Sequence, residues 1–241
     1  HPRTDNNVRG TLLLLLWAWS AVALCAPHQH KAPVVLAPGY APLSFTPPEP
    51  GSYALPAMGS AADGAVIDSD GNSAQLHDFL GGKPTVLSFI FTTCDDVNGC
   101  PLATYVMRSV QDALQADPST ADKARLVSFS FDPVFDTPDV IDAYGSQFRA
   151  GDFDWQFLTT EGATTLDPIL SAYGQWVIRD YDENGEYKGT MSHILRVFLI
   201  DESRQIRNIY STSFLHADTV ANDVRSLLIE AAAQPSADTG S

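Results

Sequence analysis

The sequence PTVLSFIFTTCDDVNGCP, residues 84–101, joins a buried strand to a helix through two cysteines. Its first half is a nearly continuous run of apolar and β-branched residues, which is typical of a central strand buried on both faces. Pro101 follows the second cysteine, and proline is favoured in the first turn of a helix. The next residues, LATYVMRSVQDAL (102–114), place apolar side chains on one helical face. The stretch therefore predicts a strand, a loop with Cys94 and Cys100, and a helix.

Strand and helix patterns continue to alternate along the rest of the chain. Further buried-strand runs follow, and Thr137 with Pro138 forms a typical helix start. Upstream, Asp70 and Gly71 favour a hairpin turn. This order predicts an α/β protein with a thioredoxin-like fold, a central mixed β-sheet flanked by helices and an N-terminal β-hairpin extension. The predicted elements are strands at 124–132 and 155–160, helices ending near Phe148 and Tyr173, a hairpin of 194–201 with 205–211, and a terminal helix at 218–233.

The protein is strongly acidic, with 29 Asp and Glu against 14 Lys and Arg and a net charge of -15. Nucleic acids and anionic membrane surfaces attract proteins with a basic surface. The composition therefore predicts no nucleic-acid partner and favours a protein or a small ion.

The N-terminal residues carry the pattern of an export signal. Arg3 and Arg9 precede the apolar run LLLLLWAWSAVALCA (12–26), which is shorter than the ~20 residues of a confident membrane span. Residues 1–26 are therefore predicted to be a signal peptide, or an uncleaved N-terminal membrane anchor that tethers the protein to the inner membrane. Under both alternatives the rest of the chain is exported and periplasmic.

Behind this segment the chain is predicted to divide into a linker, one domain and a tail. Residues 27–56 contain many of the prolines and lack a sustained period, which predicts an extended Pro-rich linker. Residues 57–235 carry the strand and helix patterns and predict a single domain. Residues 236–241 are predicted to be a disordered tail.

Export changes how the cysteines are interpreted, because an oxidising compartment permits disulfides. Cys25 lies in the predicted leader, which leaves Cys94 and Cys100. Both stand where a strand meets a helix, and backbone N–H groups with the helix dipole favour the thiolate there. Thiolates serve both disulfide exchange and soft-metal binding. The pair therefore predicts either a redox disulfide or part of a metal site.

His193 is the candidate third ligand. It stands at the start of the predicted strand 194–201, in a segment that a thioredoxin-like sheet places beside the cysteine loop. Two thiolates and one imidazole form a soft donor set, which suits copper better than magnesium or calcium. A lone histidine is more often an ordinary surface or core residue. The alternative hypothesis is therefore a periplasmic thiol–disulfide oxidoreductase that acts on a partner's cysteines.

Three segments resemble the Sco/SenC family of thioredoxin-fold copper chaperones, which is named for the assembly of cytochrome c oxidase. They are FIFTTC and CPLA around the cysteines, FSFDPVFDTPDVIDAYGSQF (129–148) and SHILRVFLID (192–201). The resemblance implies that Cys94, Cys100 and His193 are copper ligands. It implies a metallochaperone rather than an enzyme, with a copper ion as cargo. The implied partner is a cytochrome oxidase copper-site subunit or another exported copper protein.

The chain departs from this family in the length of its spacer, residues 95–99. The family usually has three residues between its cysteines, whereas this chain has five, including Gly99. A longer loop costs more ordering entropy, so the departure predicts looser metal geometry. Two acidic residues in the second segment, Asp132 and Asp136, are predicted to cap the strand end and the helix start rather than to bind metal.

Overall fold

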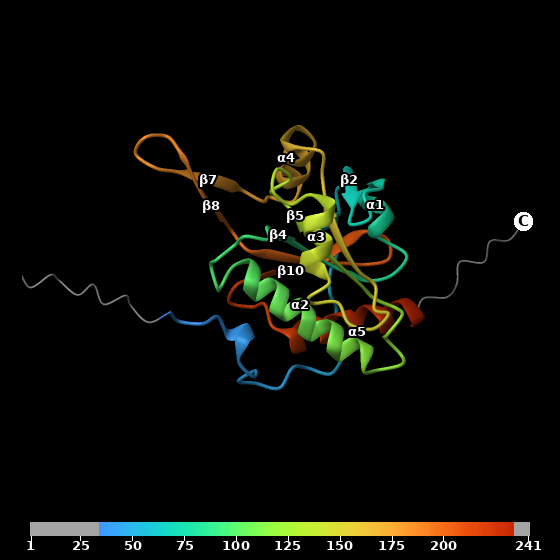
Figure 1. Cartoon of the computed structure of the whole chain (residues 1–241). Helices are drawn as coiled ribbons and strands as arrows, with labels where there is room; N and C mark the ends of the chain where they lie inside the picture. The colour runs from blue at the N-terminus through green and yellow to red at the C-terminus, as the bar shows by residue number, and fades with distance from the viewer. Residues whose placement is uncertain (1–33, 234–241) are drawn as a thin grey trace, which may run out of the picture. The chain divides into compact units, whose positions relative to one another are not determined.

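The computed structural model describes residues 34–233 (Figure 1). The predicted signal peptide or anchor at 1–26, the first part of the predicted linker and the predicted tail at 236–241 lie outside the described residues. Among the helices that are described, none has the length and apolar character needed to cross a membrane.

The strand β4 (Thr85–Ile90) lies inside an eight-stranded mixed sheet. It pairs in parallel with β5 (Arg125–Ser130) and antiparallel with β9 (Arg196–Ile200). All of its side chains are buried, as the continuous apolar run predicted. The order across the sheet is β1-β10-β9-β4-β5-β6-β2-β3, which confirms the predicted fold class with its N-terminal hairpin of β2 and β3. The other strands of this sheet are β1 (Gly59–Ser60), β2 (Ala65–Asp68), β3 (Ser73–Gln75), β6 (Trp155–Thr159) and β10 (Gln205–Ser211).

Helices form where proline and apolar spacing predicted them. The helix α2 (Cys100–Gln115) begins at the second cysteine itself, with Gly99 as its N-cap residue. Its apolar face is buried against β4 and against α5 (Ala217–Ala233), which lies beside it in Figure 1. The packing of α2 thereby fixes the second cysteine against the sheet. The remaining helices are η1 (Pro38–Tyr40), α1 (Leu76–Phe79), α3 (Pro138–Gly145) and α4 (Ala163–Ala172).

A second, two-stranded hairpin is absent from the sequence predictions. It consists of β7 (Val177–Tyr181) and β8 (Tyr187–His193) and extends away from the main sheet in Figure 1. Its turn contains Asn184 and Gly185, with Gly185 at a φ of +80°, where glycine is favoured. An Asn-Gly pair between two aromatic residues is a hairpin signal that could have revealed it.

The described part of the predicted linker is a strap, residues 35–56, that packs along the domain. Ala37 and Leu55 are buried. The amide of Asn222 in α5 donates a hydrogen bond to the carbonyl of Pro48 at 2.7 Å. Gly39 approaches the chain so closely that an added Cβ would lie 2.2 Å from the carbonyl oxygen of Leu215. The strap is thus part of the domain rather than a free linker, because helix and loop groups satisfy its irregular backbone.

A buried carboxylate anchors the strap to α5. Asp223 accepts hydrogen bonds from the hydroxyl groups of Tyr53 at 2.5 Å and Tyr210 at 2.6 Å. Its second oxygen also accepts from the amide of Asn208 at 2.9 Å. The strap, β10 and α5 therefore meet at one side chain, and each donor depends on it for its partner.

Candidate metal centre

The two cysteines lie at different depths. Cys94 is half-buried in the loop after β4, whereas Cys100 is 1% exposed at the start of α2. Both are free thiols. The sulfur of Cys100 lies 3.4 Å from Nε2 of His193, the last residue of β8. The structure thus brings the predicted imidazole to the predicted thiol pair from a hairpin that the sequence did not reveal.

Aromatic side chains hold the imidazole of His193. The ring of Phe131 meets it edge-on at 4.7 Å between centroids, and the ring of Phe91 meets it at 6.4 Å. Its Nδ1 is buried and has no hydrogen-bond partner within residues 34–233. A buried nitrogen without a partner is unusual in folded proteins. The nitrogen that faces Cys100 is Nε2, so Nε2 and the two sulfur atoms form the soft donor set that suits a soft metal ion.

The electrostatics of the two thiols differ. The neighbouring Cys100 thiol, helped by His193, stabilises the Cys94 thiolate and lowers the pKa of Cys94 to about 5. Burial raises the pKa of Cys100, and the neighbouring Cys94 raises it further. At neutral pH the metal-free centre therefore holds one thiolate and one thiol, and uptake of a metal by both sulfurs must release the Cys100 proton.

We expect iodoacetamide to modify Cys94 well before Cys100, since only Cys94 combines access with thiolate character. The labelling rate should stay high at neutral pH and fall as the pH drops through about 5, because protonation removes the nucleophile. Peptide mass spectrometry over time gives both rates. In a Cys100→Ala variant the fall should move to higher pH, since alanine has no donor and the strongest cause of the lowered pKa is gone. Equal labelling of both cysteines would contradict this arrangement.

Asp136 orients the start of the cysteine loop. Its carboxylate is buried and accepts hydrogen bonds from the hydroxyl groups of Thr92 and Ser130, each at 2.5 Å, and from the backbone N–H of Thr92 at 3.1 Å. The predicted helix cap is wrong for this residue, because Thr137 is the N-cap and no side chain caps that helix. Asp136 instead fixes the backbone two residues before Cys94, a role that no local pattern signals.

Asp132 lies beside Asp136 and is also buried. Burial raises the pKa of Asp132, and the neighbouring Asp136 adds to this effect. Nη2 of Arg179 in β7 lies 3.8 Å from its carboxylate and opposes the shift. The pair of aspartates therefore joins the loop after β5 to both the cysteine loop and the β7–β8 hairpin.

The spacer is held by the strap. Oδ1 of Asn98 accepts a hydrogen bond from the backbone N–H of Ala37 at 2.7 Å, and its amide donates to the carbonyl of Val35 at 2.8 Å. The hydroxyl of Tyr40 donates to the carbonyl of Val97 at 2.5 Å. The extra length of the spacer therefore provides contacts with the N-terminal part of the domain. The expected looseness is offset by these bonds.

The three predicted ligands are close to one another but do not form a preassembled cage. Among the residues that the structure describes, no three His, Cys, Asp or Glu side chains are arranged to hold a metal ion. Beside Cys94 and Cys100 lies a pocket of about 420 Å³ with aromatic walls from Phe91, Tyr144 and Phe148. Ligation by all three side chains therefore requires some of them to move from the positions that they hold in this structure.

Comparison with known proteins places these features in a family. Two curated relatives are similar over part of the chain: a SCO1 protein homolog of Bacillus subtilis, 32% identical over 92 residues, and a protein of Stutzerimonas stutzeri named as copper-binding, 30% identical over 129 residues. These alignments cover 38% and 53% of this chain and 45% and 58% of the relatives. The chain thus spans about half the length of the curated relatives it matches.

Solved structures support the fold. The structure of Arabidopsis thaliana ScoI with copper bound superposes with a TM-score of 0.60, at 20% identity, over 72% of this chain and 99% of that one. At this identity the likeness establishes the thioredoxin-like fold alone. The family model of SCO1/SenC matches residues 62–229. This range includes all three predicted ligands and most of the domain, and the chain therefore belongs to the SCO1/SenC family.

Proposed function

We propose that the protein binds one copper ion through Cys94, Cys100 and His193 and delivers it to an exported copper protein, with a cytochrome oxidase copper-site subunit as the expected recipient. The observation that carries the proposal is the 3.4 Å contact between the sulfur of Cys100 and the imidazole of His193, beside the second thiol. The copper named for relatives of this family supports the choice of ion. The predicted N-terminal leader supports delivery in the periplasm.

The donor set explains why copper suits the centre. Thiolates are soft ligands that Cu(I) prefers, and an imidazole adds a donor that Cu(II) accepts well. The rings of Phe91 and Phe131 pack against His193 and restrict water on that side. The half-buried Cys94 gives a recipient access to one ligand while Cys100 stays covered. Such an arrangement favours release by ligand exchange from the exposed side.

Copper stoichiometry tests the proposal. Reduced protein should bind one copper per chain, and protein oxidised to the Cys94–Cys100 disulfide should bind none, because a disulfide has no thiolate left to ligate. His193→Ala should weaken Cu(II) binding more than Cu(I) binding, since two thiolates alone satisfy the softer ion. Metal analysis with thiol titration measures the first pair, and competition with chelators measures the second. Equal copper uptake by reduced and oxidised protein would refute the site.

A second function is favoured by the difference between the two thiols. The Cys94 thiolate is accessible, and Cys100 lies behind it as a buried thiol. In disulfide exchange, Cys94 would attack one sulfur of a partner's disulfide to form a mixed disulfide and release one partner thiolate. Cys100, losing its proton, would then displace the second partner sulfur, which leaves a Cys94–Cys100 disulfide and a reduced partner. Reduction of a recipient's cysteine pair by copper-free protein is the measurement that separates this function from copper delivery.

A further inference from the structure

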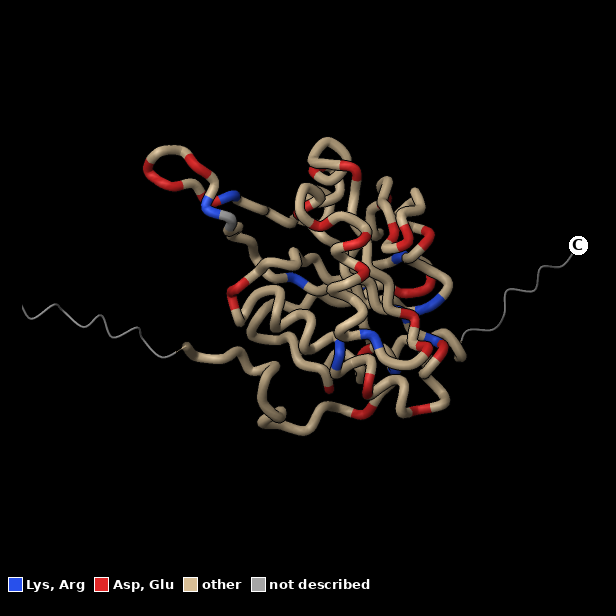
Figure 2. The backbone as a smooth tube through the Cα atoms, in the orientation of Figure 1, with Lys and Arg blue, Asp and Glu red and all other residues tan. Residues whose placement is uncertain are grey.

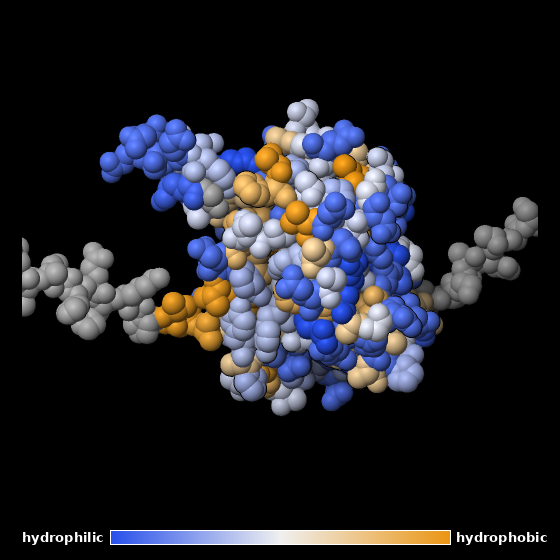
Figure 3. Space-filling view, in the orientation of Figure 1, coloured by the Kyte–Doolittle hydropathy of each residue, from blue (hydrophilic) through white to orange (hydrophobic). Residues whose placement is uncertain are grey.

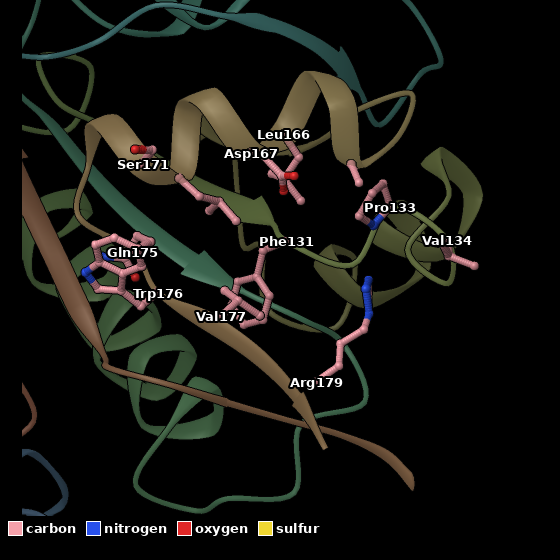
Figure 4. Close-up of a pocket in the computed structure, with 12 residues that line it drawn as sticks. Phe131, Pro133, Val134, Leu166, Asp167, Ser171, Gln175, Trp176, Val177 and Arg179 are labelled. Carbon is pink, nitrogen blue, oxygen red and sulfur yellow. The ribbon is translucent and has the colours of Figure 1, made fainter. Parts of the chain in front are cut away.

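A groove of about 410 Å³ lies at the base of the β7–β8 hairpin and is lined by Phe131, whose ring also contacts His193 of the metal centre. Figure 4 shows its residues converging from α4, from the loop after β5 and from the segment that enters β7. The lining is mostly apolar. Its main contributors are Phe131, Val134, Leu166, Leu170, Trp176 and Val177.

Large apolar side chains on the rim of the groove are open to solvent. Val134 is 76% exposed and Trp176 is 68% exposed. Figure 3 shows hydrophobic residues gathered beside the base of the hairpin, whose tip is hydrophilic. Apolar side chains clustered around a concave site are typical of a protein-binding surface.

The groove also contains a hydrogen-bond donor without a partner. Gln175 lines it and is 4% exposed, and within the described residues its amide nitrogen bonds to no acceptor. Buried amide groups in folded proteins are otherwise almost always paired. A bound chain that offers a carbonyl oxygen would satisfy this donor once the Gln175 side chain turns toward the groove, so the groove fits a peptide segment better than a hydrocarbon.

The charge around the groove indicates the nature of the partner. The β7–β8 hairpin carries more carboxylates than basic residues, which are Arg179 and Lys188. Figure 2 shows acidic residues around the tip of this hairpin. Arg179, which also lines the groove, lies 3.8 Å from the buried Asp132 and is offset by that carboxylate. Asp167 also lines the groove, so the charge around the groove is negative on balance, which favours a basic surface. The carboxylates of the hairpin are Asp180, Asp182, Glu183 and Glu186.

Two residues of the groove contact the candidate copper ligand. Val177 is the strand partner of His193 in the β7–β8 ladder. The ring of Phe131 packs edge-on against the imidazole at 4.7 Å. A side chain that enters the groove therefore presses on the same elements that position His193, and Cys94 lines a separate pocket that shares no residue with the groove.

We propose that this groove docks the copper recipient, and that its occupant is an apolar side chain set in a basic segment whose backbone carbonyl accepts from Gln175. This inference rests on the proposed function for the identity of the partner. Docking at the base of the hairpin shifts His193 through Val177 and Phe131, and so couples recognition of the recipient to the imidazole ligand.

The test uses the copper-free full chain and the peptide Ac-Lys-Lys-Phe-Lys-Lys-amide as probe. Saturable changes in the NMR signals of the Trp176 indole and the His193 ring are expected. Val134→Ser should weaken binding about fivefold or more, the loss typical of an interface anchor. Ile178→Ser is the matched control, because Ile178 is 66% exposed on β7 and does not line the groove. Its binding should stay within about twofold, the scale of a near-neutral contact.

The outcomes separate the two proposals. Equal binding of an acidic Glu-Glu-Phe-Glu-Glu peptide, or an unchanged affinity in Val134→Ser, would overturn the groove. Binding that shifts Trp176 but leaves His193 unmoved would overturn the coupling. Copper stoichiometry is measured separately on the same variants, so Val134→Ser with full copper binding and no peptide binding supports the groove. A wild-type chain that binds peptide but takes up no copper would instead defeat the proposed function.

Discussion

Replacement of both Cys94 and Cys100 by serine should reduce copper uptake from one ion per chain to none. The variant retains His193, but a single imidazole cannot hold copper against competing buffers and chelators. Serine hydroxyl groups are hard, neutral donors at physiological pH, and Cu(I) selects soft thiolate ligands. Metal analysis after copper loading and desalting gives the result directly.

The control for this loss is Cys25→Ser, made in the full chain with residues 1–26 retained, which removes the third cysteine and leaves the pair intact. It should keep full copper uptake. Because Cys100 is buried at the start of α2, the circular dichroism of the double variant must also match that of the wild type. Copper uptake that persists in a folded double variant would show that the ion binds elsewhere.

Asp223→Ala should lower the free energy of unfolding by about 2–4 kcal/mol, because each buried donor left without a partner costs about 1–3 kcal/mol. The hydroxyl of Tyr210 is the most affected, since this side chain is buried and Asp223 is its acceptor. Tyr53 and Asn208 lose the same partner. Urea unfolding followed by circular dichroism measures the change.

Asp218→Ala provides the matched control on the same helix. The side chain of Asp218 is 64% exposed, so its removal should change the stability by less than about 0.5 kcal/mol, as for surface substitutions in general. A similar loss in both variants would mean that helix charge, rather than the buried network, accounts for the effect. An Asp223→Ala protein as stable as the control would show that the strap contributes little to folding.

Elements buried in the main sheet could be predicted from the sequence, because burial imposes a pattern on their residues. The run of β4 and the proline in the first turn of α2 are examples. The β7–β8 hairpin was missed, since a two-stranded ribbon that extends from the domain needs no apolar face. The strap has no periodic sequence pattern for a related reason, and such a stretch predicts a linker. It packs irregularly, and its partner Asn222 lies 174 positions away from Pro48.

The site shows the same division. Cys94, Cys100 and His193 could be selected from residue type and predicted position, and the structure brings His193 to Cys100. The roles of Asp136 and Asn98 could not be selected, because their partners are distant in sequence. From the sequence, a carboxylate just before a helix is interpreted as a cap. Only the fold shows that Asp136 instead accepts from the hydroxyl groups of Thr92 and Ser130.

The strap links the spacer between the two cysteines to parts of the chain that are distant in sequence. Asn98 in the spacer bonds a residue 61 positions earlier in the chain, and the strap that carries this residue is itself bonded to α5 by contacts that span 170 and 174 positions. Contacts between such distant positions close late in folding, since the intervening chain must be ordered first. The final form of the spacer therefore depends on the N-terminal strap as well as on the strand and helix that flank it, and the copper site of the domain is complete only when both ends of the chain are in place.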